Sequence, residues 1–123
     1  MIMGLDVTHP SKNDRLGNSV ASAVATIDKD FVNYYSKSVV QPRPRKEIVD
    51  LENITIEFLD NFKNKNKILP DYILVYRDGV SEGQFNEVIE YEINMMKKAF
   101  VQISKENGTE YNPKITFVIV QKR

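Results

Sequence analysis

Two amphipathic helix patterns, each followed by an apolar strand pattern, limit the folds that this chain can adopt. Apolar side chains recur at spacings of three and four over residues 46–64, as on one face of a helix. The run YILVYRD at 72–78 then predicts a strand buried on both faces. A second helical stripe follows over residues 85–103, and KITFVIVQK at 114–122 predicts another buried strand. Strands separated by helices are expected to be parallel neighbours in one sheet.

Three further strands are predicted before the first helix. The segments 2–8, 19–28 and 31–41 are β-capable, and the turns between them favour an antiparallel meander. Ser81, with Gln84 three residues later, predicts a capping box at the start of the second helix. The predicted order is β-β-β-α-β-α-β in a single α/β domain, and 123 residues are enough to bury a core.

Composition excludes several classes of site. There are 17 basic and 17 acidic residues, and this zero net charge argues against a free-standing, charge-driven nucleic-acid binder. The chain has no cysteine and a single histidine, so thiol chemistry, zinc–thiolate sites and His-based metal sites are excluded. No stretch resembles a signal peptide or a membrane span. We therefore expect a soluble protein of the cytoplasm or nucleus, with no membrane partner.

Two aspartates stand where predicted parallel strands end. Asp6 lies near the end of the first strand and Asp78 at the end of the fourth, and ligand sites of open α/β sheets form beyond such ends. Two close carboxylates repel each other unless a cation or a proton lies between them, and hard oxygen ligands favour Mg²⁺ or Mn²⁺. A pair of such ions about 3.5–4 Å apart supports phosphodiester cleavage by water. The alternative is structural, since an Asp before a Gly at a strand end is an ordinary turn residue.

Four short segments resemble the Piwi domain of Argonaute proteins, in the same order along the chain. They are GLDVTHP (4–10), RKEIVDL (45–51), YRDGVSEGQF (76–85) and ITFVIVQKR (115–123). The resemblance covers nearly the whole chain and implies a ribonuclease H-like mixed sheet with helices on the sheet faces. It also implies that residues 1–123 are part of a Piwi domain whose C-terminal portion is missing.

The resemblance implies a catalytic site as well. Asp6 and Asp78 match the two metal-binding aspartates of the family, and Glu47 matches its catalytic glutamate. We expect Glu47 just inside the first helix, where a glutamate also has the ordinary role of favouring the helix dipole. The family's fourth catalytic residue, a His or an Asp, is expected beyond Arg123. The chain alone is therefore expected to be a poor nuclease.

For the parent protein, the resemblance implies an endoribonuclease, or slicer, that cuts target RNA paired to a small guide RNA, with other silencing-complex proteins as further partners. Two alternatives stay open: a scaffold that binds guide RNA without cutting, and an unrelated ribonuclease H-like nuclease that acts on DNA. Phosphate contacts are predicted for Arg43, Arg45, Lys122 and Arg123. Their structural alternative is a solvated loop and a sheet edge.

Overall fold

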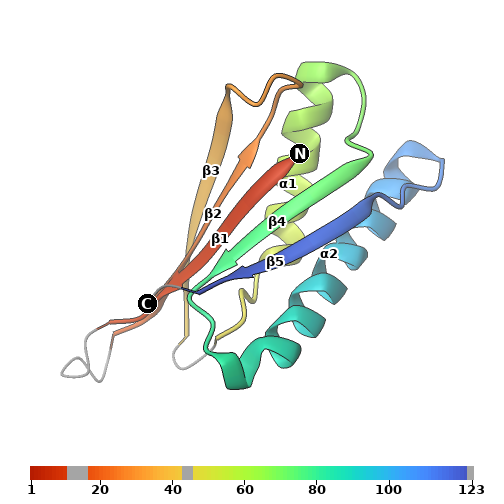
Figure 1. Ribbon diagram of the computed structural model, residues 1–123. Coiled ribbons are helices and arrows are strands. Elements are labelled where there is room, and N and C mark those ends of the chain that lie inside the picture. The colour runs from red at the N-terminus through yellow and green to blue at the C-terminus, as the bar shows by residue number, and fades with distance from the viewer. Residues whose placement is uncertain (11–16, 43–45, 122–123) are drawn as a thin grey trace.

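The chain forms a five-stranded mixed sheet with two helices, seen in a computed structural model that describes residues 1–10, 17–42 and 46–121 (Figure 1). Strand order across the sheet is β3-β2-β1-β4-β5. The element order predicted from the sequence is confirmed. The elements are β1 (Ile2–Thr8), β2 (Ser19–Thr26), β3 (Tyr34–Gln41), α1 (Leu51–Asn66), β4 (Tyr72–Asp78), the 3-10 turn η1 (Glu82–Gln84), α2 (Phe85–Asn107) and β5 (Lys114–Val120).

The central strands β1 and β4 set the position of the two aspartates. β1 pairs antiparallel with β2 and parallel with β4, while β4 pairs parallel with β5, as predicted. Leu5 of β1 is level with Arg77 of β4. Asp6 and Asp78 each follow by one residue, so they stand side by side at the same end of two strands that lie about 4.8 Å apart.

Both helices lie on the same face of the sheet (Figure 1), and the core lies between them and the strands. β4 shows the resulting alternation, because Ile73, Val75 and Arg77 are buried while Tyr72 and Tyr76 are exposed. The prediction that β4 is buried on both faces was therefore wrong. In the described part of the chain only one face is covered, and the opposite face, which we call the open face, carries Asp6 and Asp78.

Helix α1 buries the apolar face that its spacing predicts, but it begins later than expected. Its stripe of Leu51, Ile54, Phe58 and Phe62 is buried in the core. The helix starts at Leu51 rather than near residue 46, and it is preceded by a turn in which the Leu51 N–H donates to the Ile48 carbonyl at 3.4 Å.

The second helix also starts differently from its prediction. Ser81 makes no side-chain capping bond, so the predicted capping box is wrong. The Gln84 N–H instead donates to the Ser81 carbonyl at 2.9 Å, which forms the 3-10 turn that leads into α2. Neither α1 nor α2, the helices of the described residues, has both the length and the apolar character that crossing a membrane requires.

Candidate active site

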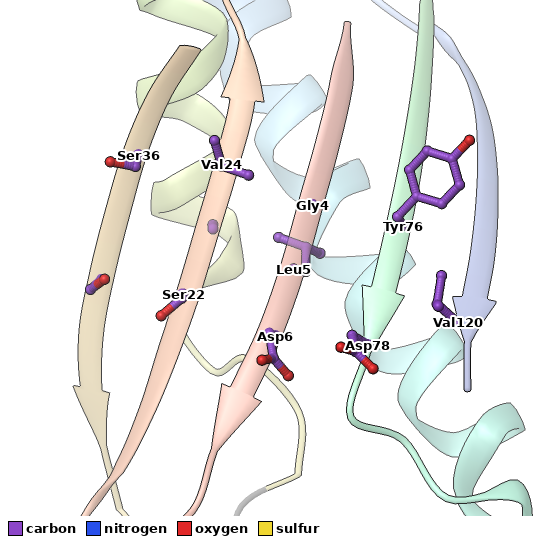
Figure 2. A pocket seen from close by; sticks show the side chains of 11 residues that line it. Gly4, Leu5, Asp6, Ser22, Val24, Ser36, Tyr76, Asp78 and Val120 are labelled. Atoms are coloured by element: carbon purple, nitrogen blue, oxygen red, sulfur yellow. The ribbon is translucent and has the colours of Figure 1, made fainter. Parts of the chain in front are cut away.

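The two aspartates predicted as a pair come together on the open face. Asp6 and Asp78 point to the same side at the ends of β1 and β4, and both line the same surface pocket (Figure 2). A second hollow beyond the strand ends is also lined by both, together with Gly79 and Ser81. Each side chain is half-buried. The arrangement holds two carboxylates next to each other while leaving them accessible to a ligand.

Gly79 leaves room for the Asp6 carboxylate. Its φ of 79° lies in the left-handed region that favours glycine. A Cβ at this position would lie 2.8 Å from Oδ1 of Asp6, closer than such contacts allow. The Gly79 N–H also donates to Oδ1 of Asp78 at 2.8 Å. Gly79, directly after β4, therefore makes room for one carboxylate and donates a hydrogen bond to the other.

The donor set of this site suits a hard divalent cation. Asp6 and Asp78 supply only carboxylate oxygens, which Mg²⁺ and Mn²⁺ prefer, and a cation between them would offset their mutual repulsion. Within residues 1–10, 17–42 and 46–121, however, no three His, Asp or Glu side chains gather as a metal-binding group. Among the described residues, the pair of carboxylates is therefore joined by no third acidic or imidazole side chain.

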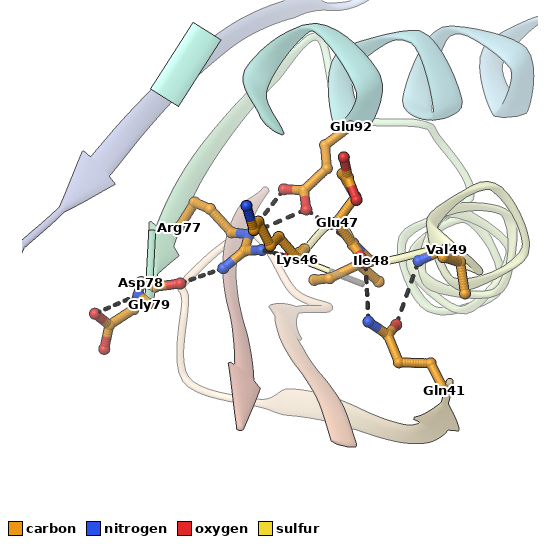
Figure 3. A network of polar contacts seen from close by, with 9 residues as sticks. All are labelled: Gln41, Lys46, Glu47, Ile48, Val49, Arg77, Asp78, Gly79 and Glu92. Atoms are coloured by element: carbon orange, nitrogen blue, oxygen red, sulfur yellow. Dashed lines mark hydrogen bonds and ion pairs between the residues drawn. The ribbon is translucent and has the colours of Figure 1, made fainter. Parts of the chain in front are cut away.

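Glu47, the third predicted carboxylate, lies elsewhere. It sits in a bend four residues before α1, so its predicted place inside the helix was wrong. Its side chain lines a hollow on the helix side of the sheet with Glu87, Glu90 and Tyr91 of α2. In Figure 3 the carboxylates of Glu47 and Asp78 lie on opposite sides of the Arg77 side chain. The structure thus joins Asp6 to Asp78 but does not bring Glu47 to them.

A buried ion pair that the sequence analysis missed lies directly behind the aspartates. Arg77 and Glu92 are both fully buried, and Nε of Arg77 donates to the two carboxylate oxygens of Glu92 at 2.9 and 3.1 Å (Figure 3). The signal was present in the periodicity. Arg77 continues the inward alternation of β4, and Glu92 stands four residues from both Val88 and Met96 in the buried stripe of α2. A charge at each of two core positions predicts such a pair.

The electrostatics of Glu92 reflect its burial. Desolvation raises the pKa of the Glu92 carboxyl. The Arg77 guanidinium and the Ile48 N–H oppose that rise, and the nearby charge of Glu47 adds to it. The contacts with Arg77 and Ile48 therefore favour the charged carboxylate against the effect of burial, and losing one of them would leave a costly buried group.

Phosphate contacts were predicted for four basic residues. Arg43, Arg45, Lys122 and Arg123 lie outside the described residues. Their proposed contacts with nucleic acid stay predictions.

Comparison with known proteins gives a consistent result over the whole chain. The family model described as the Piwi domain matches residues 1–123. Protein argonaute 18 of Oryza sativa subsp. japonica is 44% identical over 124 aligned residues, which cover 100% of this chain and 11% of that protein. The crystal structure of Kluyveromyces polysporus Argonaute with a guide RNA matches with a TM-score of 0.88 and 28% identity, over 99% of this chain and 14% of that one.

A more distant match shows the fold alone. The crystal structure of LC11-RNase H1 in complex with an RNA/DNA hybrid has a TM-score of 0.50 and 19% identity, over 98% of this chain and 85% of that one. The ribonuclease H-like fold expected from the sequence is confirmed. The chain spans about a tenth of the length of the plant relatives that it matches.

Proposed function

Since this chain belongs to the Piwi domain family of Argonaute proteins, we propose that it is the part of a Piwi domain that carries Asp6 and Asp78, two metal-binding residues of an RNA-cleaving site. The parent protein would bind a small guide RNA and cut complementary target RNA. The observation that carries the proposal is the shared pocket of Asp6 and Asp78 at the ends of two parallel strands.

In the proposed chemistry, Asp6 and Asp78 hold Mg²⁺ or Mn²⁺. When bound, such ions activate water for attack on a phosphodiester and stabilise the leaving oxygen. The protein supplies carboxylates on rigid strand ends, which keeps the oxygen ligands in place at little entropic cost. Gly79 keeps the space beside Asp6 open. Glu47 would join the site after a change in its side-chain position, and the fourth catalytic residue would come from outside residues 1–123.

The proposed partners follow from the family and from one related structure. Kluyveromyces polysporus Argonaute has been solved with a guide RNA, and this chain matches it over nearly its full length. An A-form duplex is recognised largely through its backbone, which requires cationic side chains. We propose that Arg43, Arg45, Lys122 and Arg123 contribute some of these contacts.

One observation favours a second candidate function. Glu47 lies apart from Asp6 and Asp78, and the described residues gather no three acidic ligands. A parent protein whose site stays incomplete would bind guide RNA and silence its targets without cutting. The two functions differ in whether Asp6 and Asp78 are needed for cleavage of the target RNA.

A guide-programmed cleavage assay on the full-length protein that contains residues 1–123 separates the two. We expect the wild type to cut a matched target in Mg²⁺ or Mn²⁺ and Asp78→Ala to be inactive. Asp71→Ala is the control, because Asp71 is an exposed aspartate directly before β4, at the end of the strand opposite to Asp78. Equal product from wild type and Asp78→Ala would reject the slicer. Target binding without any cleavage by the wild type would support the scaffold.

A further inference from the structure

The buried Glu92 carboxylate contacts two separate parts of the chain. One contact is the ion pair with Arg77 at the end of β4. The other is to the segment before α1, where Oε2 of Glu92 accepts the Ile48 N–H at 3.0 Å. Ile48 directly follows Glu47. One carboxylate on α2 therefore fixes the backbone beside Glu47 and, at the same time, the side chain beside Asp78.

The Arg77 side chain also connects the segment before α1 to the end of β4. With Nε held by Glu92, its Nη2 donates to the Lys46 carbonyl at 2.7 Å, and its Nη1 donates to the Asp78 carbonyl (Figure 3). The planar guanidinium thus joins the backbone just before Glu47 to the backbone of Asp78. The peptide groups on both sides of Glu47 are held, one by Arg77 and one by Glu92.

These contacts also explain why α1 starts late. In a helix that began near residue 46, the Lys46 carbonyl would accept from the N–H four residues later. Here that carbonyl accepts from Arg77 instead. Arg77 has replaced this helical hydrogen bond with a tertiary one, and Nε2 of Gln41 likewise donates to the Glu47 carbonyl at 2.9 Å. The segment is thus kept out of the helix and against the end of β4.

We propose that Glu92 is a positioning residue that, through Arg77 and the Ile48 N–H, fixes the Lys46–Ile48 segment relative to Asp78. Its effect on cleavage rests on the proposed role of Glu47 as a catalytic residue. Its effect on the backbone does not, because the contacts of Lys46 and Ile48 are independent of any reaction. Neither Glu92 nor Arg77 touches the open face, so neither contacts substrate directly.

The chemistry of the contacts requires a carboxylate and a guanidinium. Two N–H groups donate to Glu92, that of Ile48 and that of Arg77 Nε, which is shared between both carboxylate oxygens. A glutamine would turn an amide N–H₂ toward one of these donors, which needs an acceptor. A lysine in place of Arg77 could not direct separate N–H groups to Glu92, Lys46 and Asp78 in a fixed plane. Single substitutions would also leave one charge buried alone.

The test separates positioning from stability by removing the whole pair. In the full-length protein, Glu92→Met and Arg77→Met singly should lower the melting temperature, and the double variant should recover most of the loss, since an apolar pair can replace a buried ion pair. Ile103→Ala is the control, because Ile103 is a buried core residue at the far end of α2. It lowers stability without touching the segment.

Two measurements are then made on the double variant and on Ile103→Ala. Hydrogen exchange of the Ile48 amide should be about tenfold or more faster in the double variant, as expected for loss of a hydrogen bond to a charged group. Single-turnover cleavage at saturating target should slow by a similar factor, with target affinity unchanged. Ile103→Ala should match the wild type in Ile48 exchange, cleavage and affinity.

Each other outcome overturns the proposal or part of it. Wild-type exchange at Ile48 in the double variant would show that Glu92 does not hold the segment. Faster exchange with undiminished cleavage would show that holding it has no bearing on the reaction. If the wild type does not cleave at all, the proposed slicer function fails, and Ile48 exchange alone decides whether Glu92 positions the segment.

Discussion

Arg77 and Asp78 are neighbours in sequence, yet they belong to two charge pairs with opposite properties. Arg77 points toward the helices and forms a fully buried pair of opposite charges with Glu92. Asp78 points to the open face and forms a half-buried pair of like charges with Asp6. The alternation of a strand places the two pairs back to back. The same strand end thus supplies a structural connection on one face and a ligand site on the other.

The two pairs are expected to respond to substitution in opposite ways. A buried ion pair is costly to break, because removing one partner leaves the other charge desolvated. Two adjacent carboxylates instead repel each other, so they lower stability until a cation binds between them. The acidic residues near this site therefore do not form one cluster: Asp78 belongs to the open face and Glu92 to the core.

The largest effect on stability is expected for Glu92→Ala. This change leaves the Arg77 charge buried and the Ile48 N–H without its acceptor, so the free energy of unfolding should fall by about 3–5 kcal/mol. Chemical denaturation with urea measures the loss. Glu90→Ala provides the control, since Glu90 is an exposed glutamate on the same helix, and it should cost less than about 0.5 kcal/mol. Similar losses for the two variants would show that the Arg77–Glu92 ion pair does not contribute to the free energy of unfolding.

A smaller effect is expected for Gly79→Ala, which acts where the two pairs meet. The alanine would have to adopt φ near 79° with its Cβ against Asp6, so we expect a loss of about 1–3 kcal/mol and weaker Mn²⁺ binding. Urea denaturation and calorimetric titration measure the two effects. Gly83→Ala is the matched control from the same connection, because a Cβ there meets nothing within 4 Å. Unchanged Mn²⁺ affinity in Gly79→Ala would mean that the gap beside Asp6 has no role in binding.

Most of the fold could be predicted from the sequence, because local patterns determine it. The predicted bounds of β1 and β4 match the structure, and so does the apolar face of α1. The prediction failed where distant residues override local preference. The start of α1 moved because Arg77 and Glu92 bind the backbone of the Lys46–Ile48 segment, and no pattern within residues 46–64 contains that information.

The candidate site could be predicted only where local patterns place its residues. The positions of Asp6 and Asp78 could be predicted because strand ends are visible in local sequence patterns. The structure brings the two residues together. Glu47 was assigned by family resemblance, and its place relative to the aspartates depends on the path of a connecting segment. Glu92 was overlooked, because a glutamate in an amphipathic helix is usually assigned to the solvent side.

The smallest effect is expected for Asp6→Asn. It contrasts with Glu92→Ala because the free energy of unfolding should rise instead of fall. Asp6→Asn keeps the shape of the side chain and removes one of two neighbouring like charges. Without divalent metal, we expect the free energy of unfolding to rise by less than about 1 kcal/mol, since both groups are partly exposed and screened by solvent. Millimolar Mn²⁺ should then stabilise the wild type and leave Asp6→Asn unaffected, because a ligand that binds only the folded state raises its stability. Thermal unfolding with and without Mn²⁺ measures both effects. A loss of stability in metal-free Asp6→Asn would mean that Asp6 is a structural residue, and the contrast between the two charge pairs would then be lost.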